Sequence, residues 1–248
     1  MISIKKNYEI NLIKKSSSII KKIFEEIKEF CVPDISTLEI SKKIGKIIEK
    51  FGAKPAFLNY NGFPEVACIS INDTVIHGIP KDNICLKNGD IVSIDVGVNF
   101  NNYFSDACRT YLIGDVKDNA KKIVKVSEEC FFKAVSLIKP GIHLGDISFA
   151  IEEHAKKNGF SVPREFAGHG IGSHLHEDPF VFNYGLKNTG PVLLEGMCLA
   201  IEPIILEGDK DVKTLEDGWT VKTKDGKLSS HYENTVLVTK NGCEVLTL

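Results

Sequence analysis

Asp90-Ile-Val-Ser-Ile-Asp95-Val-Gly-Val98 predicts one strand, and Tyr103-Phe-Ser-Asp106-Ala-Cys-Arg-Thr-Tyr-Leu112 predicts a second, because both are rich in β-branched, aromatic and alternating residues. Asparagine fills three of the four positions between them and favours a tight reversal. A hairpin closing there is expected to place Asp95 opposite Asp106 on one face, with Cβ atoms about 5 Å apart. Two carboxylates at that distance repel by roughly 3 kcal/mol at an effective dielectric near 20. The pair therefore predicts a positive charge between them, and a metal ion is the economical choice.

Three further residues of metal-binding type lie in similar surroundings. Glu202 ends the apolar run that begins at Cys198, Glu233 precedes another apolar run, and His169 is flanked by glycines. Buried acids without a partner cost several kcal/mol. The four carboxylates carry −4, which two divalent cations balance and one does not. We therefore predict a dinuclear site. Its oxygen-rich ligand set suits Mn, Fe(II) or Co better than a structural zinc, although Zn also tolerates it.

The composition is that of an ordinary globular protein. The chain has 248 residues, of which 43% are hydrophobic and 26% charged, and its net charge of −2 does not favour a nucleic-acid or membrane partner. The sequence contains no apolar run of the length that a signal peptide or a membrane span requires. Seven scattered cysteines without a Cys-x-x-Cys pair indicate reduced thiols. These features predict a cytoplasmic protein.

The chain alternates between helical and strand-rich regions. Two helices and then strands are followed by two more helices and more strands, which predicts a duplicated α+β half within a single domain, 1–248, with an N-terminal helix in 1–30 packed on it. The last two predicted strands flank Asp225-Gly226 as a hairpin. The expected helices cover 8–30, 37–52, 118–138 and 145–158, and the expected strands cover 67–71, 90–98, 103–112, the region of His169, 197–205, 218–223 and 228–239.

These segments resemble the type I methionine aminopeptidases, in their short bacterial form, over residues 8–247. This family has the pita-bread (creatinase/aminopeptidase) fold, in which two pseudo-symmetric halves place helices on a curved antiparallel sheet. Only 33 residues separate His169 from Glu202, which leaves no room for the helical insertion of the type II enzymes. The resemblance rests on Asn72-Asp-Thr-Val-Ile-His77-Gly-Ile-Pro80, Asp90-Ile-Val-Ser-Ile-Asp95, Asp106-Ala-Cys-Arg-Thr110, Gly168-His-Gly-Ile-Gly172, Glu202-Pro203, Asp217-Gly-Trp219 and Glu233.

The resemblance implies a role for each predicted ligand. Asp95 would bind one metal in bidentate fashion, and Asp106 and Glu233 would bridge both metals. His169 and Glu202 would complete the coordination of the other metal. Glu202 would also act as the proton shuttle.

The resemblance also implies the remaining parts of the site. His77 and His176 would contact the scissile peptide and stabilise the tetrahedral oxyanion. A monovalent cation would lie near Asn72 and Ser229. The methionine pocket would be formed by Phe57, Tyr60, Phe63, Cys68, Leu175 and Trp219.

Several positions depart from the pattern common in the family, among them Ser173, where many relatives have a basic residue, and the extra His174. Phe57 replaces a cysteine found in some relatives, Phe63 a tyrosine, Leu175 a phenylalanine and His231 the usual glutamine. Alternation along the strand puts His231 on the predicted metal face, two positions before Glu233, where it could tune that carboxylate or bind a metal.

The implied activity is the hydrolytic removal of the initiator methionine from nascent proteins and peptides. The attacking group would be a hydroxide bridging the two metals, a small second residue would be preferred, and the enzyme would be a monomer that works close to the ribosome. Two alternatives stay open. An Xaa-Pro aminopeptidase or prolidase relative shares the five ligands but usually has a large additional N-terminal domain. A non-catalytic pita-bread binding protein typically has an eroded ligand set, whereas all five ligands are present here.

Overall fold

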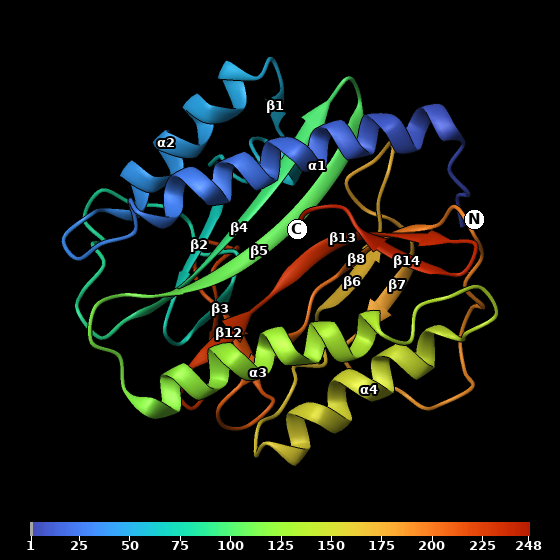
Figure 1. Cartoon of the computed structure of the whole chain (residues 1–248). Helices are drawn as coiled ribbons and strands as arrows, with labels where there is room; N and C mark the ends of the chain where they lie inside the picture. Colours follow the sequence, from blue (N-terminus) through green and yellow to red (C-terminus); the bar gives the residue numbers. More distant parts are fainter. Residues whose placement is uncertain (1) are drawn as a thin grey trace.

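A long hairpin forms the centre of the structure, a computed structural model that describes residues 2–248 (Figure 1). Its strands, β4 (Ile91–Phe100) and β5 (Tyr103–Leu112), belong to a nine-stranded sheet with the order β1-β4-β5-β13-β8-β6-β7, in which β2 also pairs with β4 and β14 with β13. The other strands of this sheet are β1 (Lys54–Pro55), β2 (Cys68–Ile71), β6 (Ala167–Gly170), β7 (Glu177–Phe182), β8 (Cys198–Ile201), β13 (Glu233–Thr239) and β14 (Gly242–Val245).

The predicted hairpin is confirmed, but its predicted register is wrong. The turn consists of two residues, Asn101–Asn102, with φ of 51° and 64°. Two-residue turns of this kind match the twist of the flanking strands and close the hairpin directly. Asp95 consequently lies opposite Cys108, and Asp106 lies opposite Gly97. The two aspartates are therefore diagonal neighbours, and they still share one face because a shift of two positions preserves the alternation.

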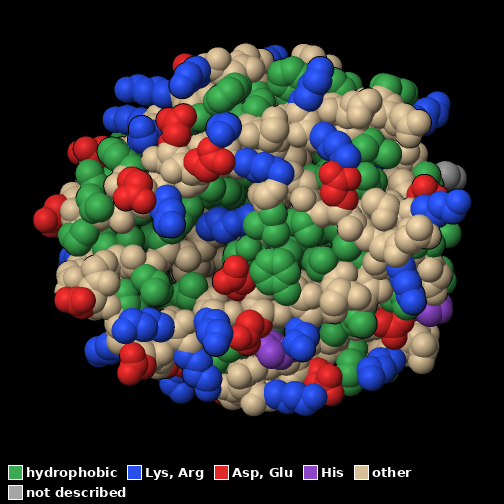
Figure 2. Space-filling view, in the orientation of Figure 1, with side chains coloured by type: hydrophobic (Ala, Val, Ile, Leu, Met, Phe, Trp, Pro, Cys, Tyr) green, Lys and Arg blue, Asp and Glu red, His purple; other side chains and the backbone are tan. Residues whose placement is uncertain are grey.

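Four helices cover the sheet in two pairs, as the sequence predicts. Helix α1 (Asn7–Lys28) lies along β4 and β5, and α2 (Thr37–Lys50) packs beside α1 against β1 and β2. Helices α3 (Asp118–Val135) and α4 (Leu144–Lys157) cover the other half (Figure 1). Each pair encloses its own apolar core. On the face shown in Figure 2, acidic and basic side chains are interspersed over these helices. No helix within residues 2–248 is long and apolar enough to cross a membrane.

The second helix begins where its sequence predicts. The Ser36 side chain accepts a hydrogen bond from the Glu39 backbone N–H at 3.2 Å, and the Glu39 carboxylate accepts one from the Ser36 backbone N–H at 2.9 Å. This reciprocal pair satisfies two backbone donors that a helix terminus otherwise leaves unpaired.

The C-terminal strands differ from the prediction in two ways. The predicted strand 197–205 is divided at Pro203 into β8 and β9 (Ile204–Leu206). The predicted hairpin around Asp225-Gly226 is wrong, because β11 (Val221–Thr223) pairs with β3 (Thr74–Ile76) and β10 (Val212–Thr214), whereas β12 (Ser229–His231) pairs with β9.

The physical reason lies in the turn itself. The Asp225 carboxylate accepts hydrogen bonds from the backbone N–H groups of Lys227, at 3.0 Å, and Asp209, at 2.9 Å. The turn is thereby attached to the segment after β9, which leads β12 to pair with β9 and not with β11.

Candidate active site

The five predicted ligands lie on, or directly after, five strands that are neighbours in the sheet. Strands β4, β5, β13, β8 and β6 are adjacent in that order. The ligands they position are Asp95 on β4, Asp106 on β5, Glu233 at the start of β13, Glu202 directly after β8, and His169 on β6. Residues separated by as many as 138 positions are thus brought together (233 − 95 = 138).

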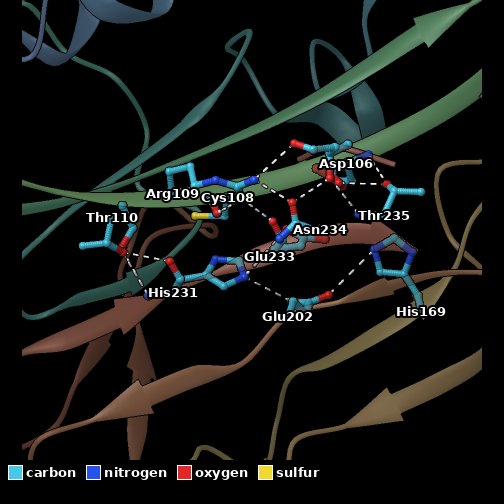
Figure 3. Close-up of polar contacts among 12 residues, drawn as sticks. Asp106, Cys108, Arg109, Thr110, His169, Glu202, His231, Glu233, Asn234 and Thr235 are labelled. Atoms are coloured by element: carbon cyan, nitrogen blue, oxygen red, sulfur yellow. Dashed lines mark hydrogen bonds and ion pairs between the residues drawn. The ribbon is translucent and has the colours of Figure 1, made fainter. Parts of the chain in front are cut away.

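The ligand atoms form two overlapping groups. Atoms of Asp106, His169 and Glu233 lie within 4.8 Å of one another, and so do atoms of Asp95, His231 and Glu233. Glu202 joins the first group, since its Oε1 lies 3.8 Å from His169 Nε2 (Figure 3). Because the groups share Glu233, they form two adjoining positions that fit a pair of ions.

Several of these atoms have no hydrogen-bond partner. Among the buried side-chain atoms without one are Asp95 Oδ1, Asp106 Oδ1, Glu233 Oε1 and His231 Nε2. An isolated polar atom in this condition costs about 1–3 kcal/mol, and more where it carries charge. The cluster therefore fits divalent cations, which would satisfy all these atoms at once.

Burial determines the protonation of the cluster in the absence of metal. It raises the pKa of Asp95 to about 7, and it raises the pKa of Asp106, Glu202 and Glu233 well above the usual values, with the neighbouring carboxylates adding to the effect. Burial also lowers the pKa of His169 to about 3, so its imidazole is neutral. His169 Nδ1 lies 2.9 Å from the Gly170 carbonyl and donates to it, which leaves the Nε2 lone pair directed at the carboxylates.

We expect these shifts to make the stability of the metal-free protein depend on pH. A carboxyl whose folded-state pKa is raised contributes stability at low pH, and this contribution is lost as pH rises through the folded-state pKa. Buried histidines with lowered pKa values oppose this trend only below about pH 6.5. The free energy of unfolding should therefore be lower at about pH 8 than at about pH 6.5. It falls by about 1.4 kcal/mol per pH unit for each carboxyl that is still protonated in the folded protein but ionised in the unfolded chain, as Asp95 is below about pH 7.

Urea unfolding followed by circular dichroism measures this fall, and saturation with a divalent metal should remove it. A metal-free protein with equal stability at both pH values would contradict the expectation.

Two contacts that the sequence did not reveal hold the ligand strands together. The Thr235 hydroxyl accepts a hydrogen bond from the Asp106 backbone N–H and donates one to the Asp106 carbonyl, both at 2.9 Å. The Arg109 guanidinium donates to the Glu233 carbonyl at 2.6 Å and to the Thr247 carbonyl at 3.2 Å. It also lies over the rings of Phe24 and Tyr232, 4.9 and 4.6 Å from their centroids. The sequence does not reveal these contacts, because the partners are distant along the chain.

The cluster opens into a cavity of about 580 Å³. All five predicted ligands, His77, His176 and all six predicted pocket residues line this one cavity. Seven further residues at its wall were not predicted from the sequence, and two of them are exposed aromatic side chains on β7, Phe180 and Phe182. The other five are Asn61, Ile76, Glu165, Phe166 and Ala167.

The two histidines next to the cluster differ in their contacts. His77 has φ of 56°, and its ring packs against Phe166 and Trp219, with both centroids 6.0 Å away. Burial lowers its pKa to about 4. His176 Nδ1 lies 2.8 Å from the Tyr60 hydroxyl, and its ring centroid lies 4.3 Å from that of His169.

Comparison with known proteins agrees with this geometry. A profile of metallopeptidase family M24 matches residues 11–240. A solved methionine aminopeptidase from Thermotoga maritima superimposes with a TM-score of 0.98 at 43% identity, over 100% of this chain and 99% of that chain. The fold is therefore the predicted α+β pita-bread fold, and its class is a metallopeptidase.

The sequence relatives define the class more closely. A methionine aminopeptidase from Clostridium perfringens is 48% identical over 248 residues, which cover 100% of this chain and 99% of that protein. This chain belongs to the methionine aminopeptidases of metallopeptidase family M24. A prolidase from Pyrococcus furiosus superimposes with a TM-score of 0.81 at 28% identity, over 99% of this chain but only 65% of that one.

Proposed function

We propose that this chain hydrolyses the first peptide bond of proteins and peptides that begin with methionine. One observation carries the proposal: a single cavity joins a carboxylate cluster fit for two cations to an apolar pocket. Its volume, about 580 Å³, lies within the range of pockets that enclose small ligands. We also propose a preference for a small second residue, as the resemblance to the family implies.

Divalent metal use accords with membership of family M24. Asp95, Asp106 and Glu233 would hold one ion, and Asp106, His169, Glu202 and Glu233 the other. When bound, the ions would supply the acidity that makes an attacking water reactive near neutral pH. This mixed set of carboxylates and imidazole would accept Mn, Fe(II), Co or Zn.

The protein's own groups would handle the protons. Glu202 lies beside both groups of the cluster, so its carboxylate would take a proton from the attacking water and pass it to the leaving amine. The Tyr60 hydroxyl stays protonated because its pKa is raised by burial, and it would donate to His176 Nδ1. His176 Nε2 would then carry the proton and donate to the scissile carbonyl, and neutral His77 would donate from the other side.

The pocket would recognise methionine by soft apolar contacts. Phe63 and Trp219 meet edge to face, with ring centroids 5.3 Å apart. Thioether sulfur makes favourable contacts with aromatic rings. The Cys68 thiol stays protonated, since burial and the nearby carboxylates raise its pKa well above the usual value. It would act as a small apolar surface, together with Phe57 and Leu175.

The remaining expectations concern the surroundings of the enzyme. Nascent chains would be the substrates, and we infer a cytoplasmic monomer that works close to the ribosome. A monovalent cation near Asn72 and Ser229 is supported by the buried Ser229 hydroxyl, which has no hydrogen-bond partner. The Ser229 backbone N–H also donates to the Asn72 carbonyl at 2.8 Å, which holds the two residues together.

The test is methionine release from Met-Gly-Met-Met and Met-Leu-Met-Met by the metal-free protein, with Mn(II), Co(II) or Fe(II) added back. We expect metal-dependent cleavage of the glycine peptide only, because a bulky second side chain would collide with the site. Robust cleavage of Xaa-Pro peptides without methionine release would favour the prolidase-like alternative. If no peptide is cleaved with any of the metals, the remaining alternative is a non-catalytic binding protein.

A further inference from the structure

His231 presents an unpartnered nitrogen to the carboxylate cluster. Its side chain is 3% exposed, and its Nε2 is buried without a hydrogen-bond partner. This atom lies 3.7 Å from Glu202 Oε2 and 3.7 Å from Glu233 Oε2 (Figure 3). A nitrogen and an oxygen at that separation are too far apart for a hydrogen bond.

The same distance is natural for two ligands of one ion. Metal bonds of about 2.1 Å, set at angles near 120°, separate two donor atoms by about 3.6 Å. His169 has this relation to Glu202, with its Nε2 3.8 Å from the carboxylate Oε1. Glu202 therefore lies between two imidazoles, and each faces a different oxygen of its carboxylate (Figure 3).

We propose that His231 is a metal ligand, which shares with Asp95 and Glu233 the ion that would otherwise have only oxygen donors. The proposal rests on the dinuclear site of the proposed function. Each ion of the pair then has one imidazole, His169 on one side and His231 on the other. Because imidazole suits Co, Fe and Zn, whereas oxygen ligands suit Mn and Mg, His231 would shift this position towards the former metals.

The strand pairing around His231 explains how its side chain reaches the cluster. β12 pairs with β9 and ends at His231, and β13 begins at Glu233 after the single residue Tyr232, so His231 and Glu233 reach one cluster from two different strands. The His231 backbone N–H lies 3.3 Å from the Thr110 hydroxyl of β5, which fixes the end of β12 against the hairpin that carries the aspartates.

Two measurements on the full-length protein test the proposal, and neither depends on activity. The variant is His231→Gln, and the matched control is His174→Gln, whose side chain is 80% exposed. In calorimetric titration of the metal-free proteins with Co(II), we expect His231→Gln to weaken one of the two binding steps by about 10–100-fold. The other step should change by less than about threefold, and the control should match the wild type. The loss of affinity in His231→Gln should be smaller with Mn(II) than with Co(II).

X-ray absorption of the cobalt-loaded proteins counts the imidazoles directly. We expect one imidazole for each cobalt in the wild type and half that number in His231→Gln. Unchanged titrations, an equal weakening of both steps, or one imidazole per pair of ions in the wild type would overturn the proposal. The metal-free variant should unfold at the wild-type temperature; if it does not fold, the imidazole count in the wild type still decides.

These results are separable from the proposed function. Two imidazoles per pair without methionine release would refute the peptidase and leave the ligand assignment intact. Methionine release with one imidazole per pair would refute the ligand assignment and leave the peptidase intact.

Discussion

Replacing Glu202 with glutamine is expected to lower kcat by about 10³-fold, the largest loss of any single substitution considered. Glutamine keeps the shape of the side chain but cannot accept a proton, and general acid–base groups contribute about 10²–10⁴-fold. The change also removes one negative charge from a cluster in which Glu202 lies 3.8 Å from His169 and 3.7 Å from His231. The measurement is methionine release from Met-Gly-Met-Met at saturating metal.

A matched control uses a glutamate outside the cavity. Glu153 on α4 pairs with Lys157 at 3.2 Å, and Glu153→Gln should leave turnover unchanged. Metal content has to be measured in parallel, since Glu202→Gln also weakens the binding of one ion. Turnover close to wild type with both ions bound would mean that Glu202 is not the proton shuttle.

Replacing His77 with alanine is expected to lower kcat by about 10²-fold while both ions remain bound. Removing one donor to a developing oxyanion typically costs about 10²–10³-fold. His77 packs against the rings of Phe166 and Trp219, and it is not among the grouped ligand atoms. Metal content by atomic absorption and turnover on the glycine peptide give the two readouts.

A second variant separates the lost donor from backbone strain. His77 has φ of 56°, a conformation that asparagine tolerates better than alanine. His77→Asn keeps both the conformation and an N–H donor, so its activity should lie between those of wild type and alanine. Loss of an ion in either variant would instead identify His77 as a ligand.

The strand pattern predicted the shared face of the two aspartates but not their register. Alternation of period two determines which face Asp95 and Asp106 occupy, and an error of two positions leaves that face unchanged. Register depends on the turn, and three asparagines among four residues allow more than one closure. Only the geometry of Asn101–Asn102 decides between them.

The sequence likewise predicted some features of the candidate site and not others. Charged residues inside apolar runs are visible in sequence, and the cluster and pocket could therefore be anticipated together with their resemblance to a family. The contacts of Arg109 gave no such signal, because its partners belong to β13 and to the C-terminal segment. The orientation of His231 towards both Glu202 and Glu233 likewise depends on the pairing of β12 with β9, which the sequence analysis did not predict.

The anchoring of Thr247 beside the ligand strands has a consequence for synthesis. Its hydroxyl accepts a hydrogen bond from the Thr235 backbone N–H at 3.2 Å and donates one to the Asn234 side chain at 2.8 Å. While a copy of this chain is being translated, the hairpin with Asp95 and Asp106 emerges well before Glu233 and Thr247. Chains are made from the N-terminus at about 5–20 residues per second, so Glu233 and Thr247 are synthesised several seconds after the two aspartates. An emerging copy therefore cannot process other nascent chains, and maturation depends on copies completed earlier.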